Sequence, residues 1–190
     1  MKLRRTLVVL LAVLFAVGVT SVAFASSIHL KGGSHAEPDF VDNGLTLSVS
    51  GEISGLGNED VQVTLTATGN PSATCTNPGS DTHQPAGHNP AEVTLTGTVS
   101  IPTSEFKNGN TTFGINQVLV TGGPPTPVAG APECPNPNWI EDITDVAFTS
   151  ATVTVSQPSF GTLTVSCTFS SPTSDGAVPA NQVTCTSSSS

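Results

Sequence analysis

The stretch CPNPNWIEDITDVAFTSATVTVSQPSFGTLTVSCTF, residues 134–169, decides the fold class of this chain. It holds the only tryptophan, Trp139, two of the four cysteines and the longest alternation of apolar and small polar residues. A period of two is typical of a half-buried β-strand. The run turns at Gln157-Pro158-Ser159 and resumes with one apolar face, made of Leu163, Val165, Cys167 and Phe169. The stretch therefore predicts two neighbouring strands of a β-sandwich core.

The alternation changes parity inside the first of these strands. Val146 and Phe148 occupy even positions, whereas Ala151, Val153 and Val155 occupy odd positions. A strand that shifts by one residue turns its side chains to the other face unless a β-bulge absorbs the extra residue. We therefore predict a bulge near Thr149-Ser150.

Five further segments carry strand signals, and no segment carries a helical period. They are residues 45–53, 61–67, 93–101, 111–120 and 183–186. About seven short strands with two proline-rich crossovers predict an all-β protein, an immunoglobulin-like antiparallel sandwich. A jelly roll or a small barrel is the alternative. The predicted single domain spans residues 44–186.

The remaining segments are predicted to lack regular structure. Residues 26–43 show no sustained period and predict a flexible lead-in. Residues 76–90 contain three prolines and leave no room for a strand, and residues 121–138 form a second long loop with six prolines. The serine tail, residues 187–190, is predicted to be disordered.

Residues 1–25 have the pattern of a signal peptide. Lys2, Arg4 and Arg5 precede an apolar stretch, and Ala23-Phe24-Ala25 matches the small-x-small cleavage rule. A retained membrane anchor is the alternative, but the apolar stretch is short for a membrane span. We therefore predict a secreted, extracellular protein that has no membrane contact after cleavage.

The charge that remains after cleavage excludes two classes of partner. Three of the five basic residues leave with residues 1–25, so two lysines face 14 acidic residues, a formal charge of −12. Such a surface has almost nothing to neutralise phosphates, and nucleic acid and anionic membranes are poor partners. The acidity itself identifies neither a ligand nor an oligomeric state.

The four cysteines predict two disulfides, because exported proteins meet an oxidising compartment. Cys167 and Cys185 lie equally far from Gly176, so an antiparallel pair of strands would place them opposite each other. The remaining pair is Cys75–Cys134. Each of these two cysteines precedes an Asn-Pro dipeptide, and their bridge would tie the two long loops together at one end of the sandwich.

A pattern of loop and strand residues resembles small secreted microbial proteins of unknown function. It comprises Cys75-x-Asn77-Pro78-Gly79, Gly87-x-Asn89-Pro90, Trp139, Asp145-Val-x-Phe148 and Ser166-Cys167-x-Phe169. The Asn-Pro-Gly and Gly-x-Asn-Pro elements are not explained by strand patterning. The resemblance implies an exported β domain and supplies no catalytic residue.

Histidines and acidic residues are the candidates for a ligand or metal site. His83 and His88, in the first long loop, could bind a soft metal with Cys75 or Asp81, although solvated loop histidines are the simpler interpretation. Glu141, Asp142 and Asp145 are candidates for a weak calcium site, although no EF-hand spacing is present. No other cofactor is expected. The chain has no Gly-x-Ser-x-Gly or His-Glu-x-x-His motif, and we expect no catalytic residue.

Three further features have ordinary explanations. Trp139 is a candidate sugar-stacking residue, but we assign it first to packing over the nearby disulfide. Threonines at alternate positions, such as Thr64-x-Thr66-x-Thr68, could bind ice or polysaccharide, but threonine is common on the solvent side of a strand. Asn110-Thr-Thr112 is an N-glycosylation sequon, which matters only in a eukaryotic source.

These observations favour a secreted, non-enzymatic β-sandwich that acts as a binding or structural module of an envelope or matrix, with a glycan or envelope component as its partner. The alternative is a secreted carbohydrate-binding protein or hydrolase with its site in loops 76–90 and 121–138. In both, the candidate binding residues are His83, His88 and Trp139.

Overall fold

A computed structural model describes residues 27–33, 35–77, 79, 82–85, 91–115, 118–125, 134 and 138–190. The predicted signal peptide and His88 lie outside these ranges. Within the described ranges, the molecule contains no helix whose length and hydropathy would let it cross a membrane.

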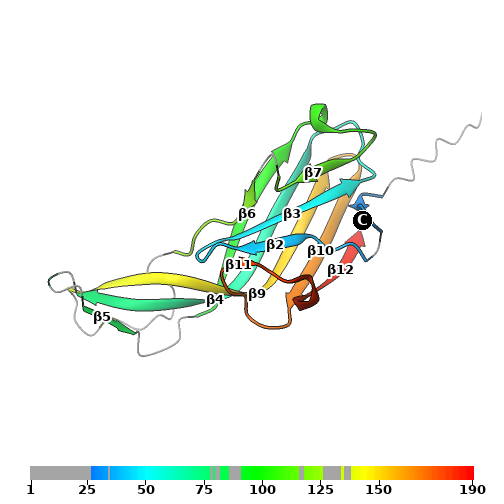
Figure 1. Cartoon of the computed structure of the whole chain (residues 1–190). Coiled ribbons are helices and arrows are strands. Elements are labelled where there is room, and N and C mark those ends of the chain that lie inside the picture. Colours follow the sequence, from blue (N-terminus) through cyan, green and yellow to red (C-terminus); the bar gives the residue numbers. More distant parts are fainter. Residues whose placement is uncertain are drawn as a thin grey trace, which may run out of the picture.

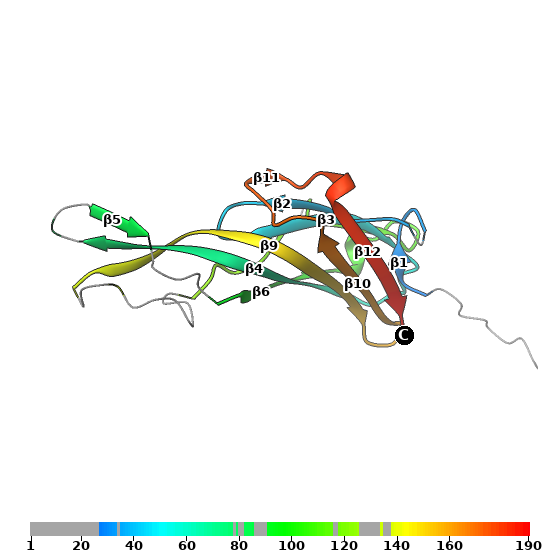
Figure 2. The ribbon, with the colours of Figure 1, turned by 90° about the horizontal axis from the view of Figure 1, so that it is seen from below.

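The chain forms two antiparallel sheets that pack face to face, as predicted for a sandwich (Figures 1 and 2). The first sheet contains β1 (His29–Leu30), β2 (Asp39–Asp42), β3 (Leu47–Ser54), β7 (Thr111–Phe113), β8 (Leu119–Val120) and β11 (Gly176–Ala177). The second contains β4 (Val61–Asn77), β5 (Thr82–Pro85), β6 (Val93–Ile101), β9 (Ile140–Gln157), β10 (Gly161–Phe169) and β12 (Val183–Ser189). Two 3₁₀ turns are η1 (Thr103–Glu105) and η2 (Ala180–Gln182). The described strands do not close into a barrel.

The long strands β4 and β9 are the centre of the second sheet. They pair from Gln62 opposite Ser156 to Thr76 opposite Ile140. Near the start of β4, the body of this sheet runs in the order β12, β10, β9, β4 and β6. Beyond the body, β4 and β9 continue together as a narrow ribbon, with β5 alongside β4 (Figures 1 and 2). We call residues 70–77 and 140–147, with β5, the arm.

The predicted bulge in β9 is confirmed, and a second one lies closer to the tip of the arm. The register shifts between Thr68 and Gly69, which face Ser150 and Phe148, so Thr149 is the extra residue. A second shift between Ser72 and Ala73 makes Thr144 the extra residue. Both extra threonines donate their hydroxyls to β4 carbonyls: Thr149 to Thr68 at 3.2 Å and Thr144 to Ser72 at 3.3 Å. The side chain thus supplies a hydrogen bond where the backbone ladder is interrupted.

The apolar faces of both sheets form one core. Along β9 and β10 the predicted inward residues, including Phe148, Ala151, Val153 and Leu163, are buried. The first sheet contributes Phe40, Leu47, Val49 and Phe113, among others. Phe40 of β2 and Phe169 of β10 join the two layers with ring centroids 5.3 Å apart in an edge-to-face arrangement. Burial of these side chains is the main favourable contribution to folding.

Both disulfides have the predicted partners. Cys167 and Cys185 face each other in the register of β10 and β12, with Cα atoms 4.1 Å apart. Cys75 is bonded to Cys134, with Cα atoms 5.6 Å apart. The Cys75 bridge lies on the arm rather than at the end of the sandwich body. Two disulfides indicate an oxidising environment for the folded chain.

Both predicted flexible ends contain sheet structure. Residues 29–30 and 39–42 pair with β3, and Ile28, Leu30 and Phe40 are buried, so the lead-in contributes to the core. At the other end, β12 continues to Ser189, which pairs with Leu163. The predictions of a flexible lead-in and a disordered serine tail were therefore wrong. A short or serine-rich strand needs no apolar pattern of its own when its backbone pairs with a neighbouring strand.

Two loop predictions also need correction. The loop 76–90 contains β5, which pairs with residues 74–77 of β4, although we expected no strand there. The predicted strand 111–120 is divided into β7 and β8, because Gly114 adopts φ +78° and turns the chain. After β8, residues 121–122 run close to β6: Gly122 donates to Thr96 at 3.0 Å, and an added Cβ on Gly97 would lie 1.7 Å from the Val120 carbonyl oxygen. Gly97 thus permits the two sheets to meet at this edge.

Candidate functional site

The predicted site at the ends of the two long loops lies on the arm and not on the body of the sandwich. The structure describes only part of this site. Thr76 pairs with His83 of β5 on one edge and with Ile140 on the other. The backbones of His83 and Trp139 therefore come to the same end of the arm, together with the Cys75–Cys134 bridge. His88 lies outside the described residues, so the predicted grouping with it stays a prediction.

Trp139 does not belong to the core of the sandwich, whereas its packing over the Cys75–Cys134 bridge stays a prediction. Its side chain is only partly buried, and it is not a member of the core cluster of the sandwich. The next residue, Ile140, is 56% exposed. The arm is a two- to three-stranded ribbon with no second layer of described strands over it (Figure 2), so most of its described side chains are exposed or only partly buried.

The predicted calcium set Glu141, Asp142 and Asp145 is not brought together. Glu141 pairs with Cys75 on one face of the arm, whereas Asp142 and Asp145 pair with Thr74 and Ser72 on the other. Among the described residues, the carboxylates that lie close to Asp145 are those of Asp42 and Asp175. Asp142 instead accepts a hydrogen bond from the Thr76 hydroxyl on the arm. Glu141 is partly buried opposite Cys75, and its Oε1 has no hydrogen-bond partner among the described residues.

Asp145 instead joins two aspartates that the sequence analysis did not single out. Carboxylate oxygens of Asp42, Asp145 and Asp175 lie within 4.8 Å of one another where the arm leaves the sandwich. Asp42 begins the turn between β2 and β3, and Asp175 lies between β10 and β11. Asp42 is only 2% exposed; it accepts the Thr173 hydroxyl and the Gly44 N–H, the latter at 2.9 Å.

Burial raises the pKa of Asp42, and the carboxylates of Asp145 and Asp175 act in the same direction. The hydrogen bonds from Thr173 and Gly44 lower the same pKa, but burial outweighs them. Three carboxylates at this spacing offer oxygen ligands of the type that calcium selects. The hydrogen bonds from Thr173 and Gly44 to Asp42 also have a structural role, because both residues connect the turn to β9. Phe148 of β9 donates its N–H to the Thr173 hydroxyl, and Val146 of β9 donates to the Gly44 carbonyl.

A large pocket lies at the opposite end of the sandwich, away from the arm. We call it the end pocket; it has a volume of about 920 Å³. Three connections form it: residues 55–60 between β3 and β4, residues 102–110 between β6 and β7, and the β9–β10 turn. Its described lining consists of two aromatic rings, one aliphatic side chain, two glycines and three polar residues: Phe106, Phe160, Leu56, Gly57, Gly109, Asn58, Thr103 and Ser159.

Hydrogen bonds hold these three connections in place. Gln157, only 1% exposed, accepts the Gly57 N–H at 2.9 Å and donates its amide to the Glu59 carbonyl. Both carboxylate oxygens of Glu59 accept from Ser159, one from its N–H at 3.0 Å and one from its hydroxyl at 2.8 Å.

The remaining connection, residues 102–110, is joined to the first in the same way. Leu56 donates to the Gly109 carbonyl at 3.0 Å, and Thr103 donates its N–H to the Asp60 carboxylate at 2.9 Å. The walls of the end pocket are therefore fixed before any ligand arrives.

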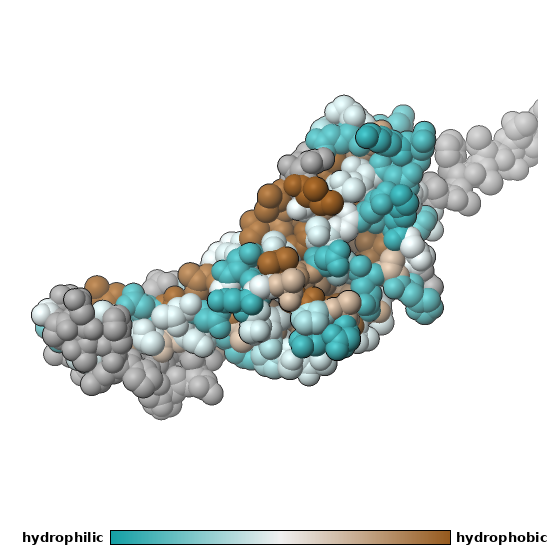
Figure 3. Space-filling model, in the orientation of Figure 1, coloured by the Kyte–Doolittle hydropathy of each residue, from teal (hydrophilic) through white to brown (hydrophobic). Residues whose placement is uncertain are grey.

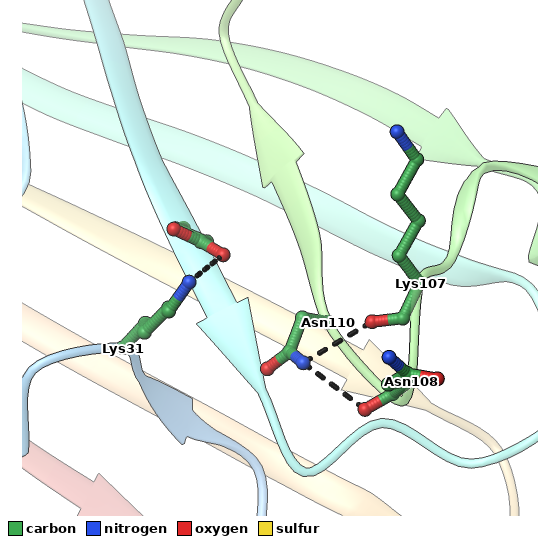
Figure 4. Close-up of polar contacts among 5 residues, drawn as sticks. Lys31, Lys107, Asn108 and Asn110 are labelled. Carbon is green, nitrogen blue, oxygen red and sulfur yellow. Dashed lines mark hydrogen bonds and ion pairs between the residues drawn. The ribbon is translucent and has the colours of Figure 1, made fainter.

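A smaller depression of about 540 Å³ adjoins the same connection and contains both lysines that follow residue 25. Lys31 forms an ion pair with Glu52 at 2.6 Å (Figure 4). In the turn after Lys107, the Asn110 side-chain amide donates to the carbonyls of Lys107 and Asn108 at 3.1 and 3.0 Å (Figure 4). The sequon nitrogen is therefore used to close the turn in the folded chain.

Large hydrophobic side chains are also exposed in the described part of the chain, on the body and on the arm (Figure 3). The most exposed are Val118 at 67%, Ile115 at 65% and Ile140. Single exposed apolar residues are normal on protein surfaces. These three do not line the end pocket.

Sequence reasoning missed the end pocket because its residues come from three distant segments of ordinary composition. One signal was present in the sequence. Gln157 ends a run of inward apolar residues, so its side chain was expected at a core position, where a buried amide needs hydrogen-bond partners from a neighbouring segment. For the aspartates, the signal was Asp42-Asn-Gly44, a turn sequence.

Fold and pocket define a two-sheet β-sandwich with a projecting arm and a preformed pocket at the other end. Comparison with protein-family models, with curated proteins and with solved structures finds no match to this chain. The resemblance to small secreted microbial proteins therefore stays a prediction, and a function has to be argued from the geometry.

Proposed function

We propose that this chain is a secreted, non-enzymatic binding module that holds a neutral ligand, such as a sugar unit of an envelope or matrix glycan, in the end pocket. The observation that carries the proposal is that three connections, cross-linked by hydrogen bonds, enclose a mostly apolar pocket. Ligand sites are typically preformed and apolar, with a few polar groups that orient the ligand. Loops fixed on a rigid scaffold commonly carry function.

The chemistry of the lining supports a neutral ligand. Phe106 and Phe160 offer aromatic surface to the C–H groups of a sugar ring, and Asn58, Thr103 and Ser159 offer hydrogen bonds to its hydroxyls. None of the described lining residues is ionisable, so the pocket provides no counter-charge.

The same lining supports binding rather than catalysis. General acid–base catalysis needs a titratable group within hydrogen-bond reach of the substrate. Two carboxylates contact lining residues, and both already accept hydrogen bonds that hold the connections: Glu59 accepts two from Ser159, and Asp60 accepts one from Thr103. The alternative site in loops 76–90 and 121–138 lies largely outside the described residues, and a hydrolase panel addresses it directly.

The proposal includes secretion of the chain and an immunoglobulin-like arrangement of its strands. Secretion after removal of residues 1–25 is supported by the two disulfides, which need an oxidising compartment. An immunoglobulin-like arrangement is supported by antiparallel sheets whose consecutive strands pass between layers, as from β3 to β4 and from β6 to β7. Neutral glycans are the proposed partners; nucleic acid and anionic membranes are not.

A neutral-glycan array tests the proposal. Asn58→Trp fills the end pocket from an exposed position, and Asn181→Trp is the matched control on the distant η2 turn. We expect binding of a subset of glycans that falls at least tenfold in N58W and is unchanged in N181W. Binding that is insensitive to N58W, or its complete absence, would contradict the end pocket. Turnover of any glycan by the wild-type chain would contradict the non-enzymatic role.

A further inference from the structure

The outer face of the second sheet is a continuous layer of hydroxyl side chains. The outward positions of β4, β6, β9, β10 and β12 in the body are all serine or threonine, with the single exception of Gln62. We call this surface the hydroxyl face. Sequence analysis identified separate threonine strands, but only the pairing of five strands makes one surface from them.

The strand register aligns these residues in rows across the sheet. One row is formed by Thr98, Thr64, Thr154, Thr164 and Ser188, each directly opposite the next. The two rows beside it, toward the arm, also contain only serine and threonine. Neighbouring residues within a row are about 4.8 Å apart, and neighbouring rows about 6.8 Å apart, from ordinary strand geometry.

The rows are held in a regular orientation by the core beneath them. The outward residues of β4 alternate with Val63, Leu65 and Ala67, which are all fully buried. Threonine is branched at Cβ and has restricted χ1 freedom, so each residue presents one methyl and one hydroxyl in few orientations. Thr64 and Thr98 hydroxyls lie 3.1 Å apart, which shows neighbouring residues of a row in hydrogen-bond contact.

This face is unlike the rest of the chain in its charge. The segments 61–69, 93–101, 150–157, 161–169 and 183–189 contain no Asp, Glu, Lys, Arg or His, although 14 acidic residues occur elsewhere. Solvent-facing sheet surfaces usually mix charges of both signs for solubility. A preference of threonine for strands explains single positions, but it does not explain the complete exclusion of charge from five adjacent strands.

We propose that the hydroxyl face binds an extended, neutral, hydroxyl-rich polysaccharide. Each row offers donors, acceptors and methyl groups in alternation, and these complement the hydroxyls and C–H groups of sugar rings. An anionic polymer is disfavoured, because no cation lies on this face and the chain is strongly acidic. Since β-sheets twist by roughly 20° per strand, a flexible polymer follows this face better than a planar ice surface does.

This inference does not rest on the end pocket, which is formed by the connections at the end of the sandwich. The two surfaces can therefore be altered separately. The hydroxyl face is changed by Thr96→Lys with Ser166→Lys, two exposed residues of one row. The charge-matched control is Ile115→Lys with Val118→Lys, which are also exposed and lie outside the five strands.

Co-sedimentation of the chain, without residues 1–25, with amorphous cellulose and with insoluble starch tests the inference. We expect the wild type to sediment with at least one polymer, the T96K/S166K variant to bind at least tenfold more weakly, and I115K/V118K and N58W to bind as the wild type does. A second face variant, Thr96→Val with Ser166→Ala, removes hydroxyls without adding charge and should also weaken binding. Thermal unfolding confirms that each variant is folded.

Five outcomes would overturn the inference. The wild type would bind neither polymer, or T96K/S166K would bind normally. Loss of sedimentation in N58W alone would assign the polymer to the end pocket. Arrest of ice growth without polysaccharide binding, or a dimer that dissociates in T96K/S166K, would assign the hydroxyl face to ice or to a second copy of the chain.

Discussion

The ionisation of Asp42 is coupled to the fold. Its carboxylate is buried at the base of the arm beside two other carboxylates, and burial raises its pKa. In the unfolded chain this carboxyl titrates at its ordinary value. Between the ordinary value and the raised folded value, the native state therefore binds more protons than the unfolded state, and the free energy of unfolding decreases as the pH rises.

Asp42→Asn should remove this pH dependence. The contribution of Asp42 is fully present below the ordinary aspartate pKa and is lost as the pH rises through the folded pKa. The asparagine variant should therefore show a flatter dependence of unfolding free energy on pH in that window, and at neutral pH it should be at least as stable as the wild type. Urea denaturation at a series of pH values measures both, and Asp175→Asn, at an exposed position, should have a smaller effect. Identical pH profiles for wild type and D42N would contradict the argument.

Single residues of this kind are hard to predict from a sequence. Asp42, Asp145 and Asp175 are separated by more than a hundred residues at the extremes, and the contact depends on the pairing of two sheets. The predicted set Glu141, Asp142 and Asp145 was chosen from sequence proximity, but neighbouring residues of a strand alternate between faces, so Glu141 points away from Asp142. The contact of Asp145 with Asp42 and Asp175 has no counterpart in the local sequence. The predicted cysteine partners were correct because strand register alone decided one pair.

At the scale of the element, strand β9 shows how a sequence encodes a bulge. The parity change between Phe148 and Ala151 revealed the extra residue, since both side chains had to reach the same core. The second bulge, at Thr144, was missed although Ile143 and Val146 also differ in parity. Ile143 lies on the arm and is only partly buried, so its position gave a weaker constraint.

Deletion of Thr149 should be tolerated, whereas deletion of Thr152 should not. Without Thr149, Phe148 still faces inward, Ser150 outward and Ala151 inward, so the expected loss is mainly its hydrogen bond to Thr68, about 1 kcal/mol. Without Thr152, every residue on one side of the deletion turns to the wrong face of the sheet. Urea unfolding should give a midpoint close to the wild type for the first variant and no cooperative transition for the second. Equal effects of both deletions would refute the bulge assignment.

Short elements escaped prediction for a related reason. The strands β1, β2, β5 and β11 have two to four residues each, too few to show a period. Their extended conformation depends on pairing with a neighbouring strand: β1 and β2 pair with β3, and β11 pairs with β2. Strand β12 beyond Cys185 consists of threonine and serines, and its pairing with β10 supplies the order that its side chains do not.

At the scale of the whole molecule, the sequence predicted the class of fold but not its outline. The alternation of apolar and polar residues is a local property, and it specified the strands of the body. The arm arises because β4 and β9 continue to pair after the first sheet has ended, through residues such as Asn70, Ser72 and Asp142 that are not typical of a core. The end pocket and the hydroxyl face likewise exist only after distant segments have been assembled.

The outline predicts that the body and the arm differ in stability. In the body, β4 is covered by the first sheet and its inward residues, such as Val63 and Leu65, are fully buried. In the arm, most described side chains are exposed or only partly buried, and the ribbon relies on backbone pairing and the Cys75–Cys134 bridge. Regions with few buried apolar contacts open at a lower free-energy cost than the whole molecule unfolds.

The rate of amide hydrogen exchange should therefore differ between the arm part and the body part of the same strand. We expect residues 70–77 and 140–145 to exchange at least tenfold faster than residues 61–69 and 150–157 of the same strands. Replacing Cys75 and Cys134 with alanine should accelerate exchange in the arm and leave the body unchanged, because the bridge is attached to β4 at Cys75, on the arm and not in the body. The matched control, replacement of Cys167 and Cys185 with alanine, removes a bridge within the body and should accelerate exchange in β10 and β12 instead. Uniform protection along β4 and β9 would show that the arm and the body unfold as one cooperative unit.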